Sequence, residues 1–134
     1  MNNNIQEDYV SFETAKLLKE KGFDVHCNSL YYDNSGNVSE IGNYNSEDNE
    51  EDGPHSSRPS QTLSVKWIRE NFGMHIKIDW FLKDDNSIDW DFCIQKIGTD
   101  IDEKGNSEYL RDYDPETGFN SPEEATEAAL KYVF

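Results

Sequence analysis

The sequence is poor in cysteine, in basic residues and in long apolar runs, and each shortage argues against a class of protein. Cys27 and Cys93 are the two cysteines among 134 residues, and they lack CxxC spacing, so neither a disulfide scaffold nor a structural zinc site is expected. No run approaches the ~18 apolar residues that a membrane span needs. The first residues lack the charged start and apolar stretch of a signal peptide. We therefore expect a soluble cytoplasmic protein without a cofactor.

The shortage of basic residues leaves the chain strongly acidic. It has 12 Lys and Arg against 28 Asp and Glu, a formal net charge of −16. Residues 43–57 carry five acids and no base, and residues 100–134 carry ten acids and three bases. Nucleic-acid backbones and anionic membranes attract basic surfaces, so we expect direct binding to neither. The charge favours a basic protein partner or a divalent cation, while acidity also serves simply to keep a small protein soluble.

The clearest pattern present is an alternation of apolar and polar residues between residues 74 and 97. Even-numbered positions are mostly apolar, odd-numbered positions are mostly polar, and a polar break at residues 83–87 divides the stretch. Because a strand sends successive side chains to opposite faces, the pattern predicts a β-hairpin, 74–82/88–97, with one apolar and one polar face. Trp80 is then expected in the core. Cys93 is expected on the polar face and partly exposed.

Registers in which the numbers of paired residues sum to an even value keep the apolar residues of both strands on one face, and we compare two of them. One register places Asp79 opposite Asp91, and the other places Asp79 opposite Cys93. Like charges that lie directly opposite each other cost stability. The sequence therefore predicts the second register, unless a cation lies between the two aspartates.

Three helices are predicted at residues 11–21, 61–72 and 122–133. Ser11, Ser60 and Ser121 are suited to cap their starts, Glu124 to complete a capping box at the third, and glycines to end the first two. Together with the hairpin they predict an α+β fold: a single domain, residues 1–134, with an antiparallel sheet of three to five strands and the helices packed mainly on one face.

Shorter elements are predicted between these. Strands are expected at residues 30–32, 38–41 and 109–113, and a mobile acidic loop at residues 43–59. Gly118 is expected to take a positive φ in a turn after Tyr113. Phe119 would then return beside Tyr113 or Leu110.

The polar face of the hairpin is the one candidate site for chemistry. It carries His75, Asp79, Asp89 and Asp91, and carboxylates of this kind bind Mg²⁺ or Ca²⁺ when they converge. The competing interpretation is a solvated strand face, and Lys77 on the same face weakens the metal hypothesis. No catalytic residue is predicted, because the chain has no nucleophile elbow and its histidines are scattered.

Three stretches carry a resemblance to a known family: residues 11–24, residues 66–70 with 75–76, and residues 121–132. Over most of its length, apart from the acidic loop and residues 98–112, the chain resembles a family of small uncharacterised proteins found in gut bacteria and their phages. The resemblance implies a mobile-element origin and an intracellular location. It carries over no catalytic residue, because the matching motifs are capped helices and core positions.

These observations favour a small, acidic, non-enzymatic binding or accessory protein that engages a basic protein partner. In one version the chain is a decoy whose acidic segments imitate the phosphates of a nucleic acid. The alternative is a metal-dependent hydrolase or nuclease that uses Asp79, Asp89, Asp91 and His75. Self-association through edge strands stays open, and the sequence does not define the oligomeric state.

Overall fold

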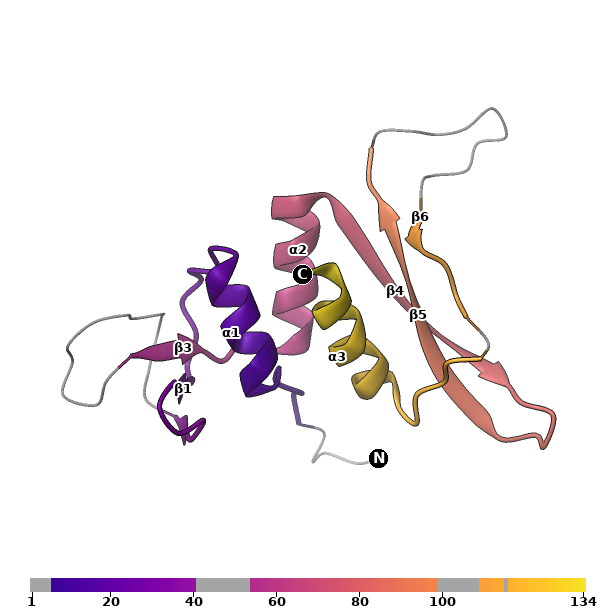
Figure 1. Cartoon of the computed structure of the whole chain (residues 1–134), viewed down its shortest axis with the longest axis horizontal. Helices are drawn as coiled ribbons and strands as arrows, with labels where there is room; N and C mark the ends of the chain where they lie inside the picture. The colour runs from indigo at the N-terminus through magenta and orange to yellow at the C-terminus, as the bar shows by residue number, and fades with distance from the viewer. Residues whose placement is uncertain (1–5, 41–53, 99–108, 115) are drawn as a thin grey trace. The chain divides into compact units, whose positions relative to one another are not determined.

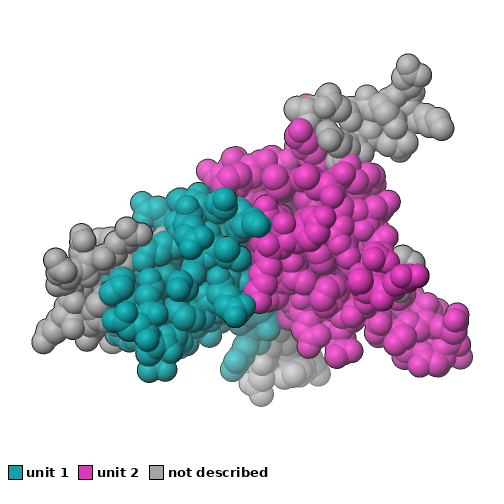
Figure 2. Space-filling view, viewed as in Figure 1, with its two compact units in different colours: residues 1–64, 134 teal, residues 65–133 magenta. Residues whose placement is uncertain are grey.

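In the computed structural model of the chain, the described residues are 6–40, 54–98, 109–114 and 116–134. The chain divides into two compact units, residues 1–64 with residue 134, and residues 65–133 (Figure 2). The elements in chain order are α1 (Phe12–Glu20), β1 (Leu30–Tyr32), β2 (Val38–Ser39), β3 (His55–Ser57), α2 (Gln61–Phe72), β4 (Met74–Leu82), β5 (Ile88–Lys96), β6 (Tyr109–Arg111) and α3 (Pro122–Val133) (Figure 1). The α+β class is confirmed, with the described strands distributed over two three-stranded antiparallel sheets.

Each helix begins after a serine, as the sequence predicts. The side-chain oxygens of Ser11, Ser60 and Ser121 accept the backbone N–H three residues further on, at 3.2, 3.1 and 3.1 Å. These bonds satisfy N–H groups that have no partner within the helix. At α3 the Glu124 carboxylate accepts from the N–H of Asn120, one residue before the cap, at 3.1 Å. The predicted capping box is therefore present in a form shifted by one residue.

The predicted glycine stops of α1 and α2 are confirmed. Gly22 and Gly73 have φ angles of +95° and +65°. The left-handed region is costly for a residue with a Cβ atom, which is why glycine ends these helices. Gly73 leads directly into β4, so the stop of α2 sets where the hairpin begins.

The first unit contains the sheet β2-β1-β3. β3 corrects the prediction of a loop over residues 43–59, because residues 55–57 pair with β1. Ser56 and Ser57 are buried there, and Ser56 donates a hydrogen bond to Asp33 at 2.7 Å. A strand held by backbone pairing and small polar side chains has no apolar alternation to reveal it. Residues 41–53 of the predicted loop lie outside the described residues.

The second unit contains the predicted hairpin, extended by β6 into the sheet β4-β5-β6. β4 and β5 pair along nine positions, and Asp79 lies directly opposite Asp91. The predicted register, with Asp79 opposite Cys93, is therefore wrong. The Arg111 guanidinium from β6 lies 3.1 Å from the Asp91 carboxylate and so offsets one of the two opposed charges.

Helix α3 covers the apolar face over the hairpin base, which we define as residues 74–78 and 92–96. The rings of Phe92 and Tyr132 lie 5.9 Å apart in an edge-to-face arrangement. Small residues of α3 allow close approach, since Ala125 and Ala129 are fully buried. The buried side chains of the base are Ile76, Phe92, Cys93 and Ile94.

The apolar face is not covered at the hairpin tip, which we define as residues 80–90. Trp80, Leu82 and Ile88 are 56%, 61% and 52% exposed. The expectation that Trp80 belongs to the core is therefore wrong. The tip forms the narrow lobe at the lower right of the second unit in Figure 2.

The polar face is partly covered by Tyr113, which hydrogen-bonds to Asp79 and to Cys93. Cys93 is only 1% exposed, so the expectation of partial exposure is wrong. Phe119 exchanges two backbone hydrogen bonds with Trp90, at 2.8 and 2.9 Å, and not with Tyr113 or Leu110 as predicted. The segment after β6 thus continues along β5.

Gly118 has a different role from the predicted one. Its φ angle is not in the positive range. A Cβ atom at this position would lie 2.0 Å from Asp89 Oδ2, so glycine is required for space. The turn therefore approaches β5 closely at a place where no side chain fits.

Candidate functional site

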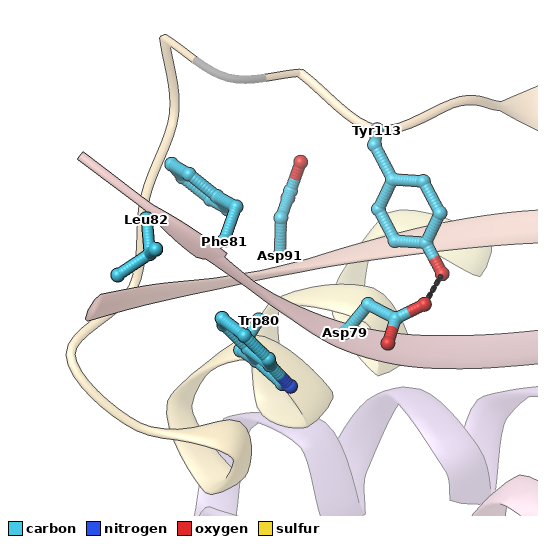
Figure 3. A pocket seen from close by; sticks show the side chains of 6 residues that line it. All are labelled: Asp79, Trp80, Phe81, Leu82, Asp91 and Tyr113. Atoms are coloured by element: carbon cyan, nitrogen blue, oxygen red, sulfur yellow. Dashed lines mark hydrogen bonds between the residues drawn. The ribbon is translucent and has the colours of Figure 1, made fainter. Parts of the chain in front are cut away.

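A cavity of about 650 Å³ lies beside the tip of the hairpin. Figure 3 shows its lining, in which Phe81, Asp91 and Tyr113 lie on one side of the strands and Trp80 on the other. The volume falls within the ~300–1,000 Å³ typical of ligand pockets. The lining residues are Asp79, Trp80, Phe81, Leu82, Asp91 and Tyr113.

The cavity follows the edge of β4. Four consecutive residues of this strand, 79–82, contribute to the lining. Successive side chains of a strand point to opposite faces, so a cavity that touches all four must extend around the strand's edge. β4 is the terminal strand of its sheet, which leaves that edge without a neighbouring strand among the described residues.

Asp91 forms the floor of the cavity and is 1% exposed. Its Oδ1 accepts from Arg111 Nη1 at 3.1 Å, and its Oδ2 accepts from the backbone N–H of Asp114 at 2.6 Å. The Arg111 guanidinium also lies 3.8 Å from the centre of the Phe92 ring and donates to the Phe92 carbonyl oxygen. A buried carboxylate with both oxygens used in this way holds the 111–114 segment over the polar face.

Asp79 lies directly opposite Asp91 but is exposed. Its Oδ2 accepts a hydrogen bond from the Tyr113 hydroxyl at 3.0 Å, which is drawn in Figure 3. Within the described part of the chain, no donor contacts its Oδ1. Asp79 therefore presents a carboxylate oxygen to the cavity that is free to accept from a ligand.

Tyr113 and Cys93 stay protonated at neutral pH. Burial raises the pKa of Tyr113, and hydrogen bonding to Cys93 and Asp79 raises it further. Burial also raises the pKa of the Cys93 thiol above its ordinary value. Because the thiolate is the reactive form of cysteine, a raised pKa makes Cys93 a poor nucleophile. Tyr113 acts as a hydrogen-bond donor that orients Asp79.

The four predicted metal candidates are not brought together. Asp89 lies 3.6 Å from Lys83 Nζ. His75 lies opposite Gln95, about 13 Å along the strand from Asp79 at ~3.3 Å per residue. Asp91 has both oxygens occupied by protein donors. Among the residues that the structure describes, no group of three or more His, Cys, Asp or Glu is placed to hold a metal ion.

The remaining lining suits an organic cation. Phe81 and Tyr113 lie on the same face of β4 as the Asp79 carboxylate, and Trp80 lines the cavity from the opposite face. Aromatic faces attract Lys and Arg, and a carboxylate adds a charged acceptor. The apolar stem of a long basic side chain packs against such rings while its head reaches the charge.

Sequence reasoning identified Asp79 and Asp91 but missed the aromatic part of the site. Phe81 breaks the polar alternation of its face, and this was the available signal. Tyr113 gave no signal in the sequence, because its contact with Asp79 joins residues 34 positions apart. Spacing along the chain does not reveal such a contact.

Comparison with known proteins adds no relative to this picture: no family model, curated protein or solved structure matches the chain. No helix in the described ranges is both long enough and apolar enough to cross a membrane.

Proposed function

We propose that the chain is a small, acidic, non-enzymatic binding or accessory protein of phage or mobile-element origin that engages a basic protein partner. The observation that supports this most directly is the cavity around Asp79. It joins an exposed carboxylate to three aromatic side chains, which is the chemistry that accepts a lysine or arginine.

The overall charge supports the same proposal. A net charge of −16 creates a field that attracts a basic protein and raises its rate of association. The basic side chain would then bind at the cavity, where the rings partly exclude water. Charge complementarity of this kind contributes more to partner choice and association rate than to affinity.

The arrangement of the buried polar groups also favours binding over catalysis. Asp91 is committed to Arg111 and Asp114, and Tyr113 donates to Asp79. These groups shape a surface and leave Asp79 as the lining carboxylate with an oxygen open to a ligand. A hydrolase would require a nucleophile or an activated water at the cavity, and the described lining offers the Asp79 carboxylate for that step without a histidine, lysine or cysteine as its partner.

The proposal is tested by titrating the full chain with short peptides of equal length that carry arginine, lysine or glutamate. We expect the basic peptides to bind, with affinity falling as salt is raised, and the acidic peptide not to bind. Asp79→Asn should weaken binding about fivefold, the effect of losing one partly exposed charge pair.

Asp84→Asn is the matched control. It makes the same charge change on an exposed residue of the same hairpin, outside the cavity. Equal weakening by both variants would show a diffuse charge effect and contradict the cavity as the site. Absence of binding by every basic peptide at low salt would contradict the function. The function would also be contradicted by a pull-down from cell lysate that recovers no basic protein at low or at high salt.

A further inference from the structure

We propose that the outer edge of β4 receives an extended segment of the basic partner as an added strand, with basic residues alternating with apolar ones. This inference rests on the proposed function and specifies the form of the ligand. It depends on the direction of the β4 backbone groups, on the exposed side chains beside that edge and on charge.

The direction of the backbone groups follows from the register. Lys83 N–H donates to Ser87 C=O at 2.9 Å, and Ile97 N–H donates to Gly73 C=O at 2.7 Å. The backbone N–H and C=O groups of odd-numbered residues in β4 therefore point toward β5. Antiparallel ladders alternate between hydrogen-bonded and non-hydrogen-bonded pairs. The N–H and C=O groups of Ile78, Trp80 and Leu82 therefore point away from β5, toward the open edge.

This edge lacks several of the features that normally prevent strand addition. Natural edges are protected by proline, lysine, bulges or a covering element. Residues 78–82 contain neither proline nor lysine, and β4 pairs with β5 without a bulge. Among the residues that the structure describes, these outward backbone groups have no partner strand, and they form a regular ladder beside the cavity.

The side chains on the two faces of this edge differ in chemistry. Asp79, Phe81 and Tyr113 lie on one face, and the exposed Trp80 and Leu82 lie on the other. An added strand would send successive side chains to these same two faces. A basic residue would then meet Asp79, and the apolar residues that alternate with the basic ones would lie on the face of Trp80 and Leu82.

Charge selects the occupant of the edge. A second copy of this chain would bring another net charge of −16 to the same surface. Like charges at an interface are unfavourable, whereas a basic segment is attracted. We therefore assign the edge to a basic partner segment and not to self-association.

The first test uses four synthetic seven-residue peptides with the full-length protein. One alternates arginine and valine, and a second has the same composition with its arginines grouped at one end. We expect the alternating peptide to bind at least fivefold more tightly than the grouped one. Equal affinities would overturn strand addition and leave the proposed preference for basic partners intact.

The other two peptides are N-methylated forms of the alternating one, and each form has every second amide blocked. A strand donates hydrogen bonds to a neighbouring strand through the amides of alternate residues, so only one of the two methylated forms lacks the amides that would face β4. We expect one form to lose about tenfold in affinity, as two net hydrogen bonds would give, and the other to keep its affinity. Equal behaviour of the two forms would overturn the proposal.

A pair of protein variants tests the same edge from the other side. Leu82→Pro removes an outward N–H and leaves the bonds to β5 intact, while Leu82→Ala shortens the side chain and keeps that N–H. We expect the proline variant to bind the alternating peptide more weakly than the alanine variant, with circular dichroism checking that both are folded. If light scattering instead shows a dimer that Leu82→Pro dissociates, the edge serves a second copy and the proposal fails.

Discussion

The base and the tip of the β4–β5 hairpin carry the same alternation of apolar and polar residues, and yet they lie in different surroundings. At the base, Ile76, Phe92 and Ile94 are buried against α3. At the tip, Trp80 and Leu82 are more than half exposed. The alternation thus determines which face of the sheet a side chain occupies. Whether that face is buried depends on how far α3 extends over it.

The polar face shows the same contrast within a single cross-strand pair. Asp91 is buried and bonded to Arg111 and Asp114, whereas Asp79, directly opposite, is exposed to the cavity. One carboxylate stabilises the fold and the other is available to a ligand. Asp79 and Asp91 are the same residue type in one cross-strand pair, and they have different roles because different residues pack over them.

The largest expected effect is the difference in the free energy of unfolding between variants of these two aspartates. Asp91→Asn leaves the Arg111 guanidinium, only 14% exposed, without its charge partner. Removing one member of a buried ion pair costs about 3–5 kcal/mol. Asp79→Asn should change the free energy of unfolding by less than about 0.5 kcal/mol, as surface substitutions do. Urea denaturation measures both, and similar losses in the two variants would erase the distinction.

A second pair of substitutions compares the base with the tip on the apolar face. Ile94→Ala removes a fully buried side chain and should cost about 2–5 kcal/mol. Leu82→Ala removes one that is 61% exposed and should cost less than about 0.5 kcal/mol. Thermal unfolding followed by circular dichroism checks the difference. A large loss from Leu82→Ala would mean that the tip is covered in solution.

The third prediction tests how closely the turn at Gly118 contacts the tip. Gly118→Ala places a methyl group against the Asp89 carboxylate and should cost about 1–3 kcal/mol, as overpacking does. The double variant Gly118→Ala with Asp89→Ala should regain most of that loss, because the clashing carboxylate is gone. Additive losses in the denaturation midpoints would argue against the close contact.

The parts of the fold that depend on local sequence were predictable. Ser11, Ser60 and Ser121 cap helices through bonds three residues long, and Gly22 and Gly73 end helices through their own φ angles. The hairpin and its two faces follow from a period of two. None of these features requires knowledge of a distant residue.

The features that the sequence did not predict correctly depend on distant contacts. The register depends on Arg111, which contacts Asp91 across 20 positions. The burial of Cys93 and the site role of Tyr113 depend on Tyr113 lying over the polar face, where it hydrogen-bonds to Cys93 and Asp79. β3 depends on pairing with β1, because its serines carry no apolar signal. In each case the deciding partner is supplied by the fold and not by the neighbouring residues.

The contacts of Asp91 also order the steps by which the second unit acquires its cavity. β4 and β5 are joined by the short turn 83–87, whereas Asp91 meets Arg111 and Asp114 across 20 and 23 positions. Contacts between near neighbours form faster than contacts that close long loops. We therefore expect the open edge of β4 to exist before Tyr113 arrives beside Asp79. During folding, the open edge of β4 would then form first, and the cavity beside Asp79 would be completed last.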